Sequence, residues 1–268
     1  GSIHYICQQA TRHIQDELRN ICRRSFWSIN NEVPSNIRKN KEKAIKLTYL
    51  CTFFIRTYHM KIICVGLNYH SHNKEMNRTP SSSEDSPVLF MKPDTALLNT
   101  GEKGDFYIPD FSSEIHYEAE LVVRIDKMGK NIAERFAHRY YSEITIGIDF
   151  TARDLQAGLK AKSLPWEISK AFDNSAAIGT LIPKDKFGKD INNLDFSLDI
   201  DGNAVQAGNT SQMIHPVDKI ISYASQFFTL KTGDLIFTGT PAGVGKVAIG
   251  NQLSGYIEGE KLLNLYIC

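Results

Sequence analysis

Glu118 and Glu120 are two residues apart in a stretch whose odd-numbered positions, from Ile115 to Ile125, are all apolar. This alternation predicts a β-strand, in which successive side chains point to opposite faces. Both carboxylates would then share one face, where each raises the pKa of the other unless a cation lies between them. The stretch is consistent with an acidic face in water and with a pair of oxygen ligands for a hard divalent cation.

A third carboxylate, Asp149, stands near the C-terminal end of a second alternating stretch at 144–150. Residues 151–154 have the Thr-x-x-Asp form of a capping box, so a helix is expected to begin there. Arg153 and Gln156 would lie on one face of its first turn. This corner would bring a carboxylate, a guanidinium and an amide into a common space. The alternative for Asp149 is an ordinary cap at the end of a strand.

His72 and Glu75 are three residues apart, shortly after an apolar segment at 61–66 that is expected to be a buried strand. On a helix this spacing places both side chains on one face, where the carboxylate can orient the imidazole as a base. A polar surface pair is the alternative. Residues 77–87 are turn and loop formers throughout, a composition typical of a flap that could carry the pair to a site.

Lys170 is surrounded by apolar residues in the segment 164–173. Lysine side chains are usually exposed. A lysine in such surroundings therefore either extends its ammonium to water along its apolar stem or has a function in a site. The segment alone leaves both readings open.

The elements that must position these residues are mostly short strands. Residues 176–236 contain several of them, joined by turns that include the hairpin signal Asp201-Gly202, and one helix is expected at 217–228. Many short strands with few helices indicate an α+β, β-rich fold.

The composition is that of an ordinary globular protein, with 268 residues, 42% hydrophobic residues and a formal net charge of +1. No apolar run approaches the length needed to span a bilayer, so no membrane partner is expected. The five cysteines are scattered and form no CxxC pair, which argues against a disulfide framework or a zinc site. This cysteine usage fits a reducing compartment, and we expect a cytoplasmic location.

Residues 1–59 are predicted to be a basic N-terminal extension, with Gly1-Ser2 resembling an expression tag, and residues 60–268 to be the main domain. Residues 1–60 hold ten Lys and Arg against four Asp and Glu, whereas the remainder holds 21 against 26. Basic residues precede a short apolar run at 47–55, as in a signal peptide, but too deep in the chain and without a cleavage motif. No aromatic recognition motif accompanies the basic run, so nucleic acid is not an expected partner. A helical extension packed on the main domain is favoured.

From about Met60 to the C-terminus, the chain resembles the fumarylacetoacetate hydrolase superfamily, above all its small single-domain branch of acylpyruvases and oxaloacetate decarboxylases. The motifs that carry the resemblance are His116-Tyr117-Glu118-Ala119-Glu120-Leu121, Asp149-Phe150-Thr151-Ala152-Arg153-Asp154-Leu155-Gln156, Leu164-Pro165-Trp166 with Lys170, and Thr238-Gly239-Thr240-Pro241. The resemblance implies a mixed β-sandwich roll of the type formed by the family's C-terminal domain, and a homodimer. It does not extend to residues 1–59.

The resemblance also implies a divalent metal site, in which Glu118, Glu120 and Asp149 hold Mg²⁺ or Mn²⁺. A small 2-oxo or 2,4-dioxo acid would bind the metal through its carboxylate and ketone oxygens. The remaining implied roles are charge at the enolate for Lys170, substrate binding for Arg153, Gln156 and Thr240, and water activation for His72 and Glu75.

These roles predict a metal-dependent hydrolase that cleaves a C–C bond in acylpyruvates. Water deprotonated by the His72–Glu75 dyad would attack the distal carbonyl, and a metal-stabilised pyruvate enolate would leave. One alternative is oxaloacetate decarboxylation, which needs the metal and Lys170 but no attack by water. Another is isomerisation of 2-hydroxyhepta-2,4-diene-1,7-dioate, with the dyad as a proton shuttle. A more remote alternative is a non-catalytic metal- or partner-binding protein whose basic first 60 residues are the functional part.

Overall fold

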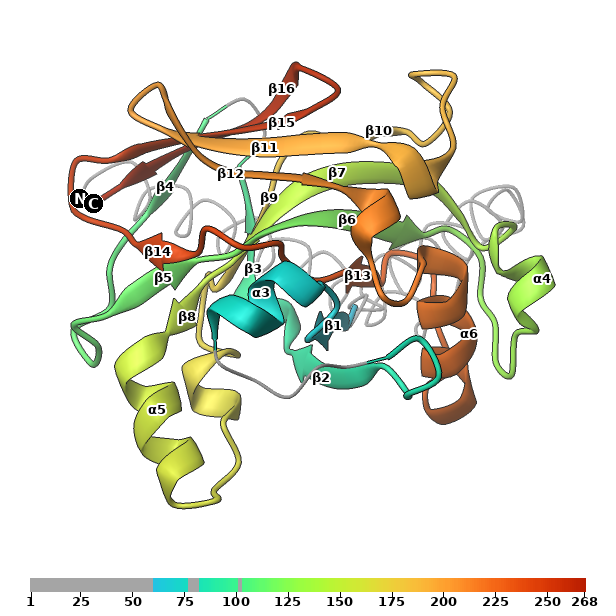
Figure 1. Ribbon diagram of the computed structural model, residues 1–268, viewed down its shortest axis with the longest axis horizontal. Helices are drawn as coiled ribbons and strands as arrows, with labels where there is room; N and C mark the ends of the chain where they lie inside the picture. Colours follow the sequence, from blue (N-terminus) through green and yellow to red (C-terminus); the bar gives the residue numbers. More distant parts are fainter. Residues whose placement is uncertain (1–59, 77–81, 101–102) are drawn as a thin grey trace, which may run out of the picture. The chain divides into compact units, whose positions relative to one another are not determined.

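The computed structural model describes residues 60–76, 82–100 and 103–268 (Figure 1). The predicted N-terminal extension and residues 77–81 of the predicted flap lie outside the described residues. The predicted domain boundary between residues 59 and 60 therefore stays a prediction.

The described residues form mostly short strands, with a few helices between them. The strands are β1 Ile62–Gly66, β2 Val88–Lys92, β3 Leu97–Asn99, β4 Gly104–Phe106, β5 Ile115–Tyr117, β6 Ala119–Ile125, β7 Tyr141–Asp149, β8 Thr151–Ala152, β9 Ala176–Ile178, β10 Ile182–Pro183, β11 Asp195–Ile200, β12 Asn203–Asn209, β13 Leu235–Phe237, β14 Gly245–Lys246, β15 Gln252–Ile257 and β16 Glu260–Ile267. The α-helices are α3 His70–Glu75, α4 Glu134–Ala137, α5 Arg153–Ala161 and α6 Val217–Phe227, and a 3₁₀ helix, η3, spans Glu167–Ser169.

The strands form three sheets. The largest has the order β2-β1-β13-β6-β7-β9-β3, with β10 also paired to β7. A five-stranded sheet has the order β12-β11-β15-β16-β4, and a small one the order β14-β5-β8. Parallel pairs (β1 with β13, β3 with β9, β4 with β16) occur among antiparallel ones, so the larger sheets are mixed. The predicted α+β, β-rich class is confirmed.

The five-stranded sheet lies over the largest sheet, as the upper part of Figure 1 shows for β11, β15 and β7. Their approach is close at Gly255 of β15, where an added Cβ would lie 2.9 Å from Ile146 of β7. Ile146 and Leu263 are fully buried in the core between the sheets. Burial of each such side chain contributes about 1.5–3 kcal/mol, so this contact holds the sheets together.

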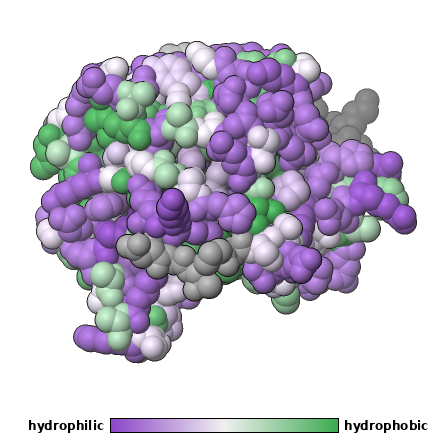
Figure 2. Space-filling model, in the orientation of Figure 1, coloured by the Kyte–Doolittle hydropathy of each residue, from purple (hydrophilic) through white to green (hydrophobic). Residues whose placement is uncertain are grey.

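The outer face in Figure 2 is largely hydrophilic, with apolar side chains gathered at the upper left.

Residues 115–125 are not the single strand that the alternation predicts. They form β5 and β6, which belong to different sheets and are separated by Glu118. The apolar alternation continues across the break because Tyr117 and Ala119 are both buried. Periodicity therefore cannot reveal that the backbone passes from one sheet to another at Glu118. The acidic face is also not in water, since Glu118 and Glu120 are both buried.

The predicted capping box at 151–154 is wrong as well. Thr151 lies in β8, and the residue before α5 is Ala152, which has no capping side chain. Asp154 instead accepts hydrogen bonds from Ser112 Oγ (2.6 Å) and from the backbone N–H of Leu155 (2.8 Å). The start of α5 is thus held by the hydrogen bond from Ser112, in the loop before β5, to Asp154, and not by a capping side chain of its own.

Other predicted elements agree with the structure. The helix expected at 217–228 is α6, and the strand expected at 61–66 is β1. Asp201 and Gly202 connect β11 to β12 with φ angles of 53° and 80°, the positive values that a tight hairpin turn of this kind requires.

Asn68, which is buried between β1 and α3, joins three segments that are distant in sequence. Its Nδ2 donates to the carbonyl oxygens of His215 (3.0 Å) and Thr238 (2.7 Å), and its Oδ1 accepts from His215 N (2.8 Å). These bonds hold the start of α3 against the end of β13. Asn68 therefore sets the place from which α3 presents His72.

Within the part of the chain that the structure describes, no helix has the length and apolar character that crossing a bilayer requires.

Candidate functional site

The three predicted carboxylates meet at one point of the largest sheet. Glu118 lies between β5 and β6, Glu120 is the second residue of β6, and Asp149 ends the neighbouring strand β7. β6 and β7 are antiparallel, with Glu120 opposite Gly147, so the start of one strand lies beside the end of the other. One oxygen from each carboxylate lies within 4.8 Å of the others, and all three side chains are buried.

Three cationic side chains surround these carboxylates. Lys170 Nζ donates to Glu118 Oε2 (2.7 Å) and to Asp149 Oδ2 (2.6 Å), so it bridges two of them. Arg153 Nη2 donates to Glu118 Oε1 at 2.6 Å. Lys92 Nζ lies 2.7 Å from Asp149 Oδ1. The buried charges are thus arranged as a compact cluster of alternating sign.

The cluster shifts the pKa values of its members. Burial favours the neutral form of Glu118, but Lys170 and Arg153 outweigh it and hold the pKa of Glu118 well below its usual range. Burial, and then the charges of Asp149 and Glu118, raise the pKa of Glu120 well above its usual range. Burial disfavours the charged form of Lys170, yet Asp149 and Glu118 more than compensate and raise the pKa of Lys170.

The donor set fits a hard divalent cation. Among the described residues no cation pairs with Glu120, which accepts one hydrogen bond from Gly239 N at 2.7 Å and is left with two carboxylates beside it. A divalent ion between the three carboxylates would supply the positive charge that Glu120 lacks. Three carboxylate ligands also leave coordination positions for the oxygens of water or of a substrate.

Lys92 was missed by the sequence analysis. Its side chain is fully buried, and its Nζ donates to the carbonyl oxygen of Lys170 and to Ser175 O and Oγ (3.0 Å each), in addition to the contact with Asp149. A usable signal was present, because Lys92 ends an apolar strand directly before a proline. Lys92 is therefore, like Lys170, a lysine in apolar surroundings, where lysine side chains are rarely found without a function.

The predicted substrate-binding residues lie beside the carboxylates. Arg153 Nη1 donates to Gln156 Oε1 at 2.9 Å, while Arg153 Nε is buried without a hydrogen-bond partner among the described residues. An unpaired buried donor of this kind suits an anionic ligand. The Thr240 hydroxyl donates to Ala119 O (2.8 Å) and accepts from Gln206 Nε2 (2.9 Å), so its hydrogen bonds are internal.

Gln206, on β12, is a second residue that the sequence analysis missed. It is buried, and its Oε1 accepts from Ala119 N (2.9 Å) while its Nε2 also donates to Pro241 O (3.1 Å). These bonds tie the five-stranded sheet to the start of β6 and to the loop after β13. No pattern around Gln206 distinguishes it from a polar residue on an exposed strand.

His72 and Glu75 lie on α3, as predicted, and His72 lines the same pocket as the carboxylates. His72 Nδ1 is 3.5 Å from Glu75 Oε2, longer than a hydrogen bond, and Glu75 accepts from Gly243 N at 3.1 and 3.2 Å. Burial lowers the pKa of His72 below its ordinary value of 6.5, although Glu118 and Glu75 oppose the shift. The imidazole is therefore neutral at pH 7 and able to accept a proton.

These side chains share one pocket, in which the β1–α3 connection, β2 and α5 surround the carboxylates. Its lining residues are Val65, Gly66, Leu67, His72, Val88, Phe90, Glu118, Glu120, Asp149, Arg153, Gln156, Lys160, Trp166, Lys170 and Thr240. All predicted site residues except Glu75 are among them. Carboxylates, cations and a neutral imidazole around one space suit the binding of an anion on a metal ion and the transfer of protons to it.

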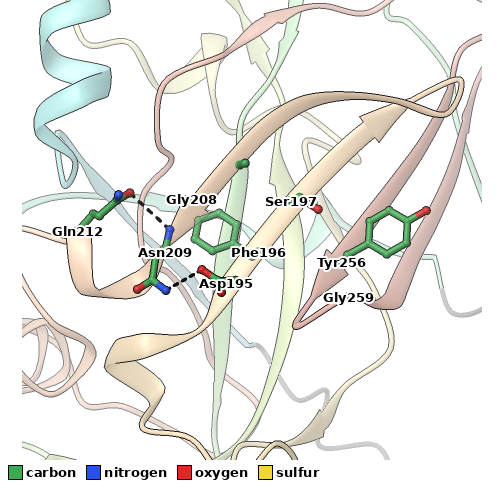
Figure 3. Close-up of a pocket in the computed structure, with 9 residues that line it drawn as sticks. Asp195, Phe196, Ser197, Gly208, Asn209, Gln212, Tyr256 and Gly259 are labelled. Atoms are coloured by element: carbon green, nitrogen blue, oxygen red, sulfur yellow. Dashed lines mark hydrogen bonds between the residues drawn. The ribbon is translucent and has the colours of Figure 1, made fainter.

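A larger cavity of about 380 Å³ lies elsewhere, on β11, β12 and the β15–β16 hairpin (Figure 3). Asn209 spans its edge, donating through Nδ2 to Asp195 Oδ1 (2.7 Å) and through its backbone N–H to Gln212 Oε1 (3.4 Å). Asp195 is the one carboxylate among its lining residues, and none of them is basic. This cavity contains none of the predicted site residues and has no comparable cluster of charges.

Comparison with known proteins assigns the chain to a family. The sequence model of the fumarylacetoacetate (FAA) hydrolase C-terminal domain matches residues 61–263. The chain therefore belongs to the fumarylacetoacetate hydrolase family. Its fold, with mixed sheets and few helices, matches solved structures of fumarylacetoacetate hydrolase family proteins, as the resemblance implied.

Three relatives illustrate the activities found among similar chains. A mitochondrial oxaloacetate decarboxylase from Dictyostelium discoideum is 46% identical over 200 residues, which are 74% of this chain and 89% of the relative. An oxaloacetate tautomerase from Escherichia coli is 39% identical over 202 residues, 75% of this chain and 90% of the relative. The structure of fumarylpyruvate hydrolase from Pseudomonas aeruginosa, in complex with Mn²⁺ and pyruvate, has a TM-score of 0.72 and 37% identity, covering 78% of this chain and 89% of that one.

Replacing Lys92 tests the role of the buried cations in stability. We expect Lys92→Met to lower the free energy of unfolding by about 3–5 kcal/mol, because it removes one of the two cations that pair with the buried Asp149 and leaves Lys170 as the other. Guanidinium denaturation of the full chain in the presence of EDTA measures this change. The control is Lys186→Met, which breaks a half-exposed pair with Glu260 and should cost about 1 kcal/mol or less. Equal losses in both variants would contradict the assigned role of Lys92.

Proposed function

We propose that this chain is a divalent-metal-dependent enzyme that acts on oxaloacetate and decarboxylates it to pyruvate through an enolate. Two relatives, 46% and 39% identical, are named for activities on oxaloacetate, one a decarboxylase and the other a tautomerase. Both reactions pass through an enolate of the same 2-oxo acid. This proposal takes the alternative from the sequence analysis as the main function and moves acylpyruvate hydrolysis to second place.

The observation that carries the proposal is the charge balance of the site. The three carboxylates and the three cations Lys92, Lys170 and Arg153 are equal in number, although none of the cations pairs with Glu120. The cluster is therefore near neutral when all six groups are ionised. A divalent ion would add two positive charges. Oxaloacetate carries two negative charges, whereas an acylpyruvate such as acetylpyruvate carries one. Charge complementarity therefore favours the diacid.

The chain's own residues supply binding and charge for the reaction. Arg153, with its unpaired Nε, and Gln156 hold the carboxylate next to the ketone. A bound divalent ion supplies Lewis-acid charge at the ketone oxygen. The C3–C4 bond breaks, CO₂ leaves, and the electron pair moves to form the enolate. Lys170, already placed between two carboxylates, stabilises the negative charge on the enolate oxygen, and protonation at C3 gives pyruvate.

A second candidate function is hydrolysis of acylpyruvates, and the dyad favours it. Decarboxylation needs no base, yet His72 is neutral, buried and 3.5 Å from a carboxylate of Glu75. Such an imidazole can deprotonate water for attack on a carbonyl, or move the C3 proton in tautomerisation. The fumarylpyruvate hydrolase with 37% identity is named for a hydrolytic reaction.

The remaining expectations stay predictions. Mg²⁺ is our predicted ion, and Mn²⁺, which is present in the structure of the hydrolase, suits the same oxygen ligands. The homodimer and the cytoplasmic location rest on the sequence analysis, and the decarboxylase relative is named as mitochondrial.

A steady-state assay with Mg²⁺ separates the two candidate functions. We expect the full chain to turn over oxaloacetate faster than acetylpyruvate, after correction for the spontaneous reaction. Lys170→Met should lower kcat for oxaloacetate about 10²-fold or more, because it removes charge at the enolate. His72→Ala should retain decarboxylation but lower acetylpyruvate hydrolysis by about 10²–10⁴-fold.

The control for the loss of a positive charge is Lys162→Met, because Lys162 is exposed and lies just beyond the end of α5. Turnover of acetylpyruvate without turnover of oxaloacetate would contradict the proposed function and support the second candidate.

The pH dependence of the base-requiring reaction follows from the environment of His72. Because burial lowers the pKa of His72 below 6.5, the neutral imidazole persists as the pH falls. The acid limb of kcat/KM for hydrolysis or tautomerisation should therefore lie below pH 6.5. Glu75 raises the pKa of His72, so Glu75→Gln should move the limb to still lower pH. An acid limb above pH 6.5, or a shift to higher pH in Glu75→Gln, would contradict His72 as the base.

A further inference from the structure

Two of the three carboxylates have a cation at each of their oxygens. Arg153 Nη2 lies 2.6 Å from Glu118 Oε1, and Lys170 Nζ lies 2.7 Å from Oε2. Lys92 Nζ lies 2.7 Å from Asp149 Oδ1, and Lys170 Nζ donates to Oδ2 at 2.6 Å. Among the residues that the structure describes, Lys170 is thus the one cation that spans two carboxylates of the cluster.

The two carboxylates that Lys170 bridges are also two of the three that would hold a divalent ion. Cations that bind the same pair of carboxylates repel each other, and each reduces the negative charge that attracts the other. The repulsion is strong here, because Lys170, Glu118 and Asp149 are all buried and water screens them little. The charge of Lys170 therefore opposes the binding of the ion.

The backbone of Lys170 is fixed, whereas its side chain has room to adjust. Its N–H donates to Glu167 O (2.9 Å), and its carbonyl oxygen accepts from Lys92 Nζ and from Ser175 Oγ (2.8 Å). The side chain is a flexible four-carbon stem that ends in a point charge. Nζ lies 5.3 Å from the centre of the Phe90 ring, a cation–π distance, and Phe90 lines the pocket. The ammonium can therefore move toward the pocket while the backbone stays in place.

We propose that Lys170 sets the affinity of the site for its divalent ion by competing with the ion for Glu118 and Asp149. The lysine that the proposed function assigns to the enolate then has a second role, and the two roles conflict, because the same charge supports the reaction and weakens metal binding. The inference rests on the divalent-ion part of the proposed function and makes no assumption about the substrate. It predicts an ion that exchanges with the solution.

Calorimetric titration of the full chain with Mn²⁺ measures the competition without any substrate. We expect Lys170→Met to bind Mn²⁺ about tenfold more tightly than the parent chain, which is within the usual size of a coupling between two sites. Lys170→Arg, which keeps the positive charge, should bind the ion no more tightly than the parent does. A purely structural role for Lys170 predicts the opposite for Lys170→Met, because carboxylates that lose their support would bind the ion more weakly.

The matched control is Lys92→Met, which also removes one buried positive charge paired with Asp149. Among the three carboxylates Lys92 pairs with Asp149 alone, so this variant should tighten Mn²⁺ binding less than Lys170→Met does. Circular dichroism establishes that each variant is folded. Unchanged or weaker Mn²⁺ binding by folded Lys170→Met, or equal tightening in both variants, would overturn the proposal.

A second measurement, on the parent chain, does not depend on the folding of Lys170→Met. The Nζ resonances of ¹⁵N-lysine-labelled protein, assigned through Lys170→Arg and Lys92→Arg, are followed during titration with Mg²⁺, which is diamagnetic. We expect the resonance of Lys170 to shift more than that of Lys92, because the ion shares both carboxylate contacts of Lys170 and the single one of Lys92. An unmoved Lys170 resonance, or equal shifts of the two, would overturn the proposal.

Measurements on oxaloacetate separate this inference from the proposed function. A parent chain that turns over oxaloacetate, together with a folded Lys170→Met variant of unchanged Mn²⁺ affinity, would overturn the inference alone. Tighter Mn²⁺ binding by Lys170→Met, in a protein whose parent chain does not turn over oxaloacetate, would support the inference and overturn the proposed function. Failure of both the parent chain and Lys170→Met to bind Mn²⁺ would overturn both.

Discussion

The bridge from Lys170 to Glu118 and Asp149 is the interaction on which the site depends. Burying a carboxylate costs several kcal/mol unless a partner compensates its charge, and three are buried here within 4.8 Å of one another. Lys170 meets two of them at 2.7 and 2.6 Å, and Lys92 and Arg153 complete the pairing on their other sides. The cluster is stable as a unit because each charge is satisfied by a neighbour, with the exception of Glu120. The unpaired charge of Glu120 is where a divalent ion would fit.

The surrounding fold keeps this cluster in position from several directions. Gly239 N–H orients Glu120, while Gln206 ties the start of β6 to the second sheet. Asn68 joins the β1–α3 connection to the end of β13, so the helix that bears His72 is fixed to the strand that precedes Gly239. Lys92 and Ser175 hold the backbone at Lys170. The site is therefore built from segments between residues 65 and 240 that are far apart in the sequence and meet in the fold.

The sequence predicts the chemical groups of the site better than it predicts the residues that hold those groups in position. Carboxylates two residues apart, an His-x-x-Glu spacing and an isolated lysine are visible in a linear chain, and the structure brings all of these residues except Glu75 to the lining of one pocket. Gln206 and Asn68 could not be singled out, because their roles depend on backbone groups that are distant in sequence. Lys92 could have been found by the argument used for Lys170. The break at Glu118 was hidden because both strands keep the same apolar alternation, and the capping box failed because β8 pairing with β5 holds Thr151 in a strand.

One site of this kind can serve several reactions, because decarboxylation, tautomerisation and hydrolysis share an enolate beside the same charges. All three reactions, as proposed here, need a divalent ion held where Glu120 lacks a cation. Titration of the full chain with Mn²⁺ by calorimetry, compared with Glu120→Gln, tests this most directly. Glutamine keeps the acceptor for Gly239 N–H, so the fold should persist. We predict one site per chain and a loss of about a hundredfold or more in Mn²⁺ affinity in the variant. Unchanged affinity in a folded Glu120→Gln variant would contradict the account.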